Sequence, residues 1–256
     1  MKKFLITFTA LFCISAIHAN AQGSAGAAAP IESRYIVDMP TAGVLHKGAF
    51  SINSMMYNSG GLLIDISTSP FTNFNFGISF SGSNIIGSGD LIWQEFPGIH
   101  LRLRLIDETT AFPAIMIGLN TQGRGIFDTE NERFQTLSPG AFVSASKNFS
   151  WLLGNIALHG GMNYSFEPVP SERAPNLYFG IEQSIGDPAS ISIEYNANID
   201  ERSDKFMSEK GLLNAAARVS IGQGFTMELQ VRDLLSHQKN MQGFTRFIGF
   251  EFIRRL

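Results

Sequence analysis

A histidine with serines nearby is the pattern in this sequence that could support nucleophilic chemistry. His159 precedes two glycines, with Asn155 on its expected strand face and Ser144 and Ser146 in the preceding expected strand. A serine nucleophile needs a neighbouring base and a third group that orients the base. The residue types are present, but no nucleophile motif surrounds either serine. An enzyme acting on lipid or peptide is therefore an alternative, and the leading expectation is that the chain has no catalytic residues.

Acidic residues gather in one long expected loop, at Asp128, Glu130 and Glu132. A protease built on paired acids would also need a histidine nearby, and this loop contains none. Such a run is typical of a solvated loop. The sequence also lacks the spacing of a calcium loop, a phosphate-binding loop or a zinc site. We therefore expect no cofactor and no metal.

A third set of residues places charge on the polar faces of expected strands. These residues, of mixed sign, are His100, Arg102, Arg104, Glu182, Glu194, Arg218, Glu228, Arg232 and Glu251. In a closed barrel they would face the lumen, where they could line a narrow channel or form a cross-linked polar plug. Arg232 and Glu251 lie on neighbouring expected strands, which predicts an interior ion pair between them.

The elements that must position these residues are strands, because apolar and polar residues alternate with a period of two. In residues 73–81, Phe74, Phe76, Ile78 and Phe80 share one face, and small or polar residues occupy the other. About 12 such segments are expected, which fits an outer-membrane barrel. They are 49–57, 62–67, 73–81, 98–106, 114–122, 140–147, 151–164, 176–184, 189–197, 211–221, 224–232 and 243–253.

The connections between these segments alternate between tight and long. Tight ones are expected near 68–72, 107–113, 148–150, 186–188 and 222–223, and longer polar ones near 82–97, 123–139, 165–175, 198–210 and 233–242. Transmembrane barrels have short periplasmic turns and longer outer loops. One connection, residues 58–61, is short where an outer loop is expected. The pattern favours a membrane barrel, and a soluble periplasmic β-sandwich that binds a ligand is a second alternative.

The first residues have the three parts of a secretory signal peptide. Lys2 and Lys3 form the basic start, an apolar run covers 4–17, and Ala19 and Ala21 form the small-x-small cleavage site. Cleavage after Ala21 would remove the only cysteine, Cys13. Residues 22–48 are then expected to be a flexible periplasmic lead-in, and residues 49–256 the barrel.

Composition limits the classes of function that remain. Charged residues make up 16% of the chain and the formal net charge is −3. Binding to nucleic acid would call for a basic excess, so we expect no nucleic-acid partner. An exported chain that is poor in charge and carries no spanning apolar run after the signal fits a barrel in the envelope of a Gram-negative bacterium.

A series of short motifs runs through residues 40–166. It consists of Pro40-Thr41-Ala42, Gly48, Leu101 to Glu108, Pro113-Ala114, Gly118, Gly123, Gly125, Phe127 and Ala145-Ser146-Lys147. In these motifs the segment resembles the YjbH-like outer-membrane proteins that are linked to exopolysaccharide production. The resemblance implies an outer-membrane β-barrel connected with surface polysaccharide. This chain is shorter than the usual members, and residues 167–256 are not covered.

The sequence therefore predicts an all-β protein, a single antiparallel transmembrane β-barrel of about 12 strands with short periplasmic turns and longer outer loops. The expected function is non-enzymatic: a porin-like narrow channel or an envelope component, with the resemblance adding a link to polysaccharide export. The expected partners are outer-membrane lipid, the barrel-assembly machinery, and a polysaccharide or small solute.

Overall fold

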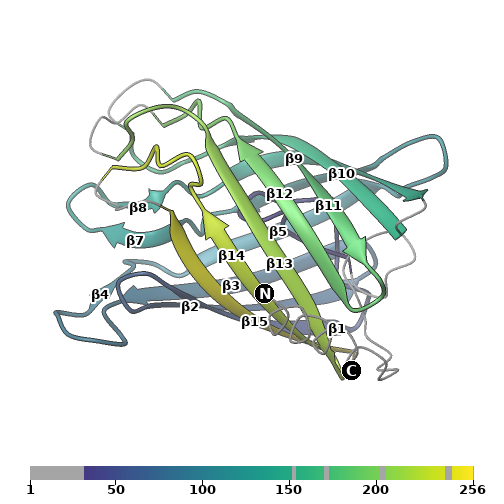
Figure 1. Ribbon diagram of the computed structural model, residues 1–256, viewed down its shortest axis with the longest axis horizontal. Coiled ribbons are helices and arrows are strands. Elements are labelled where there is room, and N and C mark those ends of the chain that lie inside the picture. Colours follow the sequence, from purple (N-terminus) through teal and green to yellow (C-terminus); the bar gives the residue numbers. More distant parts are fainter. Residues whose placement is uncertain (1–31, 152–153, 170–172, 202–205, 240–243, 256) are drawn as a thin grey trace, which may run out of the picture.

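The computed structural model describes residues 32–151, 154–169, 173–201, 206–239 and 244–255, which form strands joined by turns and loops (Figure 1). The expected signal peptide, with Ala19 and Ala21, lies outside the described residues. The strands are β1 (Ala49–Tyr57), β2 (Gly61–Phe71), β3 (Phe74–Ser83), β4 (Ile92–Trp93), β5 (Gly98–Ile106), β6 (Ala114–Asn120), β7 (Arg124–Asp128), β8 (Arg133–Thr136), β9 (Gly140–Trp151), β10 (Gly154–Tyr164), β11 (Asn176–Ile185), β12 (Ala189–Asn196), β13 (Leu212–Gly222), β14 (Phe225–Arg232) and β15 (Thr245–Arg255).

The main sheet closes on itself as an antiparallel barrel of 12 strands. Strand β1 pairs with β2 on one side and with the last strand, β15, on the other, where Ala49 lies opposite Arg255. The expected pairing of the first and last segments is therefore confirmed. Closure matters because an unpaired strand edge cannot be hydrated inside a bilayer.

The polarity of the two barrel faces separates a membrane barrel from a soluble sandwich. In β3, Phe76, Ile78 and Phe80 point outward and are exposed, whereas Asn75 and Ser79 point inward and are buried. The other barrel strands repeat this arrangement in most of their length. A sandwich would bury its apolar face in a core, so the sandwich alternative is wrong. The apolar exterior suits contact with lipid hydrocarbon.

Three short strands are not part of the barrel. β4 pairs with the end of β3, and β7 pairs with β8 in a separate hairpin within an expected long loop. All three lie at one end of the barrel (Figure 1). The turn expected at 148–150 is wrong, because β9 continues through it to Trp151 and β10 begins at Gly154. Apolar and polar residues keep alternating through 148–150, so hydrogen bonding between neighbouring strands prevails there over the sequence signal for a turn.

Candidate functional site

Residues 32–48, here called the plug, run inside the barrel. Ile36, Val37 and Met39 at its tip are almost fully buried. The chain reverses at this tip, with the N–H of Ile36 donating to Met39 O at 2.9 Å and that of Thr41 to Arg34 O at 3.0 Å. The expectation of a flexible lead-in outside the barrel is therefore corrected for residues 32–48. The physical reason is that the plug pairs with charged side chains that would otherwise stay uncompensated in the lumen.

One carboxylate holds the tip of the plug. Glu194 of β12 is fully buried, and its Oε2 accepts the main-chain N–H groups of Val37, Asp38 and Met39 at 2.9, 2.9 and 2.8 Å. The side-chain amide of Asn214 donates to its Oε1 at 2.9 Å. Successive N–H groups pointing at one anion form a concave binding site that offsets its charge. The barrel wall therefore fixes the tip through main-chain groups.

The tip also carries a charge of its own. Asp38 Oδ1 lies 2.6 Å from Arg232 Nη2 and 3.4 Å from Arg124 Nε. Arg232 stacks over the ring of Phe247 at 3.6 Å. Arg124 begins the β7–β8 hairpin, so Asp38 joins the plug both to the barrel wall and to an outer loop. Such a buried cluster depends on each charge having its partner.

A second charged contact fastens the plug below its tip. Arg34 forms an ion pair with Glu251 of β15 and donates to Ser67 Oγ at 3.0 Å. The ion pair expected between Glu251 and Arg232 is therefore wrong. Strand register explains this, because Arg232 lies opposite Thr245, at the far end of β15 from Glu251. Each residue pairs with the plug instead, and periodicity within the strands carries no information about that segment.

Two further arginines bind main-chain carbonyl groups of the plug. Arg218 donates to Ile36 O at 2.5 Å and pairs with Glu228 at 2.8 Å. Arg102 lies 4.5 Å from the centre of the Tyr35 ring and reaches Gly43 O at 3.4 Å. A guanidinium group has several donors in a fixed plane, which suits contacts with both a ring face and carbonyl oxygens.

All nine charged residues expected on the lumen face have buried or half-buried side chains inside the barrel. His100 pairs with Asp65 at 2.5 Å, and Glu228 pairs with Arg218. The other side chains contact the plug, namely those of Arg102, Arg104, Glu182, Glu194, Arg218, Arg232 and Glu251. Sequence reasoning missed the partners Glu32, Arg34 and Asp38, whose signal was three charges among small and apolar residues just before the first strand.

The long-loop end of the barrel is braced by its own buried ion pair. Arg133 of β8 pairs with Glu201, and it lies 4.3 Å from the centre of the Phe206 ring. Glu167 accepts the main-chain N–H groups of Phe134 and Ser138 at 2.8 and 2.6 Å. Burial nevertheless raises the pKa of Glu167 above its usual value. The β7–β8 hairpin is thus tied to two other loops.

The residues considered for catalysis are brought together only in part. Ser146 Oγ lies 2.8 Å from His159 Nδ1. Ser144 lies opposite Gly161, and Asn155 accepts a hydrogen bond from Ser150. The loop residues Glu130 and Glu132 are exposed at the turn of the β7–β8 hairpin. The structure therefore singles out one serine–histidine pair.

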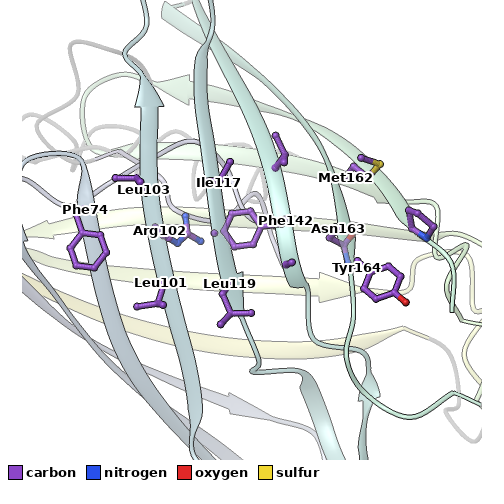
Figure 2. A pocket seen from close by; sticks show the side chains of 14 residues that line it. Phe74, Leu101, Arg102, Leu103, Ile117, Leu119, Phe142, Met162, Asn163 and Tyr164 are labelled. Carbon is purple, nitrogen blue, oxygen red and sulfur yellow. The ribbon is translucent and has the colours of Figure 1, made fainter.

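A hollow of about 550 Å³ lies on the outer face of the barrel (Figure 2). Its walls are apolar side chains of neighbouring strands, such as Leu101, Leu103, Ile117 and Leu119, with Met162 and Tyr164 beyond them (Figure 2). These side chains belong to the lipid-facing surface. The hollow is therefore mainly a feature of the membrane surface, and it reaches the plug only through Arg102 and Phe142, which also line it.

These observations define the class of the protein as a closed antiparallel transmembrane β-barrel with an internal plug. Within the described residues, no helix has the length and apolar character needed to cross a membrane. No family model matches the chain, and no curated protein matches it.

Similar solved structures include the KdgM porin, which is 12% identical, with 80% of this chain and 98% of that chain covered at a TM-score of 0.48. The NanC porin is 11% identical, with 79% and 98% covered at 0.44. OmpT, an outer-membrane protein of Vibrio cholerae, is 7% identical, with 81% and 98% covered at 0.32. At these identities the likeness concerns the fold alone.

Proposed function

We propose that this chain is an outer-membrane channel protein whose narrow lumen is closed by its own plug. The observation that carries the proposal is the way in which the plug is held. Its contacts with the wall include ion pairs and hydrogen bonds from Arg34, Asp38 and the main chain of the tip, beside apolar packing of Ile36 and Met39 on Tyr178. Water can replace polar contacts of this kind when the plug leaves. The wall left behind would be polar and able to hold water.

Three features taken together support a location in the outer membrane. The signal peptide expected at residues 1–21 directs export, the barrel is closed, and its exterior is apolar. A barrel with an apolar exterior needs surrounding lipid, and such barrels belong to outer membranes. The proposed partners are therefore outer-membrane lipid and the machinery that inserts barrels.

The class of solute follows from the size and charge of the lumen. A barrel of about 12 strands falls between barrels filled by side chains and barrels with wide aqueous pores. Positive groups such as Arg102 and Arg218 alternate with negative groups such as Glu182 and Glu251. We propose small, polar, largely uncharged solutes, with saccharides as the leading class. A role in polysaccharide export rests on the resemblance to YjbH-like proteins.

Solute uptake by proteoliposomes tests this function. Purified barrel, checked for the heat-modifiable mobility of a closed barrel, is reconstituted and exposed to neutral sugars of increasing size. The proposal predicts uptake of small sugars with a sharp size limit, and faster uptake by a variant with a loosened plug, Asp38→Asn. The matched control is Asp90→Asn, which changes an exposed loop residue. If the wild-type barrel and the Asp38→Asn barrel are both folded and neither admits solute, the result would favour a structural role in the envelope.

A further inference from the structure

Ser146 and His159 face each other across β9 and β10 inside the barrel. The strand register pairs the two residues directly, and Ser146 Oγ lies 2.8 Å from His159 Nδ1. Both side chains are largely buried. Ser144 lies on the same face two residues earlier but opposite Gly161. The contact therefore selects Ser146 among the serines of β9.

The surrounding hydrogen bonds are compatible with the arrangement of protons that a base at His159 needs. The main-chain N–H of Ala42, in the plug, donates to Ser146 Oγ at 2.9 Å. The Ser146 hydroxyl accepts there and keeps its own proton available to donate to His159 Nδ1 in the tautomer that carries the imidazole proton on Nε2. With Nδ1 accepting, the proton of a neutral imidazole lies on Nε2. That nitrogen faces Glu182 Oε2 at 3.9 Å.

The carboxylate of Glu182 is held in place from its other side. Glu182 is fully buried in β11, where Ser33 Oγ donates to its Oε1 at 3.0 Å. Arg218 Nη1 lies 3.6 Å from the same oxygen. Hydroxyl, imidazole and carboxylate then stand in the order of nucleophile, base and orienting acid. Three consecutive strands supply one residue each.

A cavity of about 220 Å³ opens beside the pair at the short-turn end of the barrel. Ser146 and His159 line it, together with Arg104 and residues 107–108 of the turn after β5. Arg104 Nε has no hydrogen-bond partner among the described residues. This N–H could therefore donate to a charge that develops on a substrate oxygen. The volume suits a small molecule, and the lining is polar and of mixed charge.

We propose that this cavity is an ester-hydrolysing site for short acyl esters of small polar alcohols, with Ser146 as nucleophile and His159 as base. This activity is separate from the proposed channel. Ser146 Oγ attacks the ester carbonyl carbon while its proton passes to His159 Nδ1. The tetrahedral intermediate then collapses, and His159 returns the proton to the departing alcohol. Water, deprotonated by His159, attacks the acyl-enzyme; the bond between the acyl carbon and Ser146 Oγ breaks, the acid leaves, and His159 returns the proton to Ser146 Oγ. Glu182, whose Oε2 lies 3.9 Å from His159 Nε2, acts as a positioning residue that attracts the imidazolium formed during the attack.

Hydrolysis of p-nitrophenyl acetate by the purified, folded barrel tests the proposal. Ser146→Ala is expected to remove most of the activity, a loss of about 10³-fold or more, as for other serine nucleophiles. The matched control, Ser144→Ala, should hydrolyse the ester at the wild-type rate. Glu182→Gln should lower kcat and leave KM unchanged, because the carboxylate does not touch the substrate. The p-nitrophenyl ester of a long fatty acid should react poorly in so small a cavity.

A fluorophosphonate probe followed by peptide mass spectrometry provides a second measurement. The proposal predicts a covalent adduct on Ser146 and none on Ser144. Absence of hydrolysis by the folded wild-type barrel, wild-type activity in Ser146→Ala, or labelling elsewhere would each overturn it. Closed-barrel mobility on gels identifies any variant that fails to fold. Sugar uptake is measured separately, so the channel and the esterase can fail independently.

Discussion

Asp38 Oδ1, at the tip of the plug, lies 2.6 Å from Arg232 Nη2, on the wall of the barrel. The exposed fraction of each residue is below 5%. A buried ion pair of this kind ties the plug to β14 near the long-loop end. Removing one charge of this ion pair should therefore weaken the attachment of the plug most strongly.

Replacing Asp38 with asparagine should loosen the plug. The substitution keeps the shape of the side chain but leaves Arg232 without its nearest anion, and breaking a buried pair costs about 3–5 kcal/mol. We expect a lower unfolding midpoint and more frequent channel openings in planar bilayers. Asp90→Asn, in an exposed loop, should leave both quantities unchanged. Unaltered stability and conductance in Asp38→Asn would show that this contact does not retain the plug.

A methyl group added at Gly180 should push against the plug. A Cβ atom built at Gly180 would lie 2.6 Å from Ile36 Cγ2 and 2.6 Å from the main-chain oxygen of Ile193. Overpacking of this kind typically costs about 1–3 kcal/mol. Gly180→Ala should therefore lower the unfolding midpoint in urea and increase conductance. The control is Gly160→Ala on β10, where the added Cβ atom would lie 3.7 Å from its nearest neighbour. Equal effects of the two substitutions would contradict a close fit between Gly180 and the plug.

Loss of the Arg133 charge should release the β7–β8 hairpin. Arg133 is almost fully buried between Glu201 and the Phe206 ring, so Arg133→Gln removes both the ion pair and the contact of its charge with the ring. We expect added protease to cut the loop within 129–132 in proteoliposomes, while the barrel strands stay protected. Arg173→Gln changes an exposed loop residue and should leave the hairpin resistant. A hairpin equally resistant in both variants would contradict this account of the outer loops.

Asp200 should make the stability of the long-loop end depend on pH. Burial raises the pKa of this carboxyl group to about 6. Because the folded protein holds the proton more tightly than the unfolded chain, stability is greatest below about pH 4 and falls as the pH rises through 6. Asp200→Asn should remove this part of the pH dependence. Unfolding midpoints at pH 4 and pH 7 measure it, and an identical pH difference in the wild type and the variant would contradict it.

Strand alternation predicted the strands and their two faces, and the alternation of tight and long connections favoured a barrel over a sandwich. The expected segment 73–81 corresponds to β3, and pairing of the first segment with the last is found between Ala49 and Arg255. The inward positions of Glu194 and Arg218 followed from the same periodicity.

The plug could not be predicted in the same way. Residues 32–48 have no periodicity, and Pro40 and Gly43 within them are typical of a loop. Their position depends on long-range partners, such as the contact of Val37 with Glu194. The incorrect pairing of Arg232 with Glu251 has the same cause. A strand pattern gives the face on which a charge lies, but its partner can belong to a segment far away in the sequence.

Conductance of a barrel with its plug locked tests the central claim most directly. The main-chain N–H of Ala42 contacts Ser146 Oγ, which brings the two residues close enough for a disulfide in an Ala42→Cys, Ser146→Cys variant. The expected mature chain has no other cysteine. We predict that the oxidised variant is silent in planar bilayers, and that reduction restores openings at the wild-type frequency. An oxidised barrel that conducts as the wild type does would contradict closure of the channel by the plug.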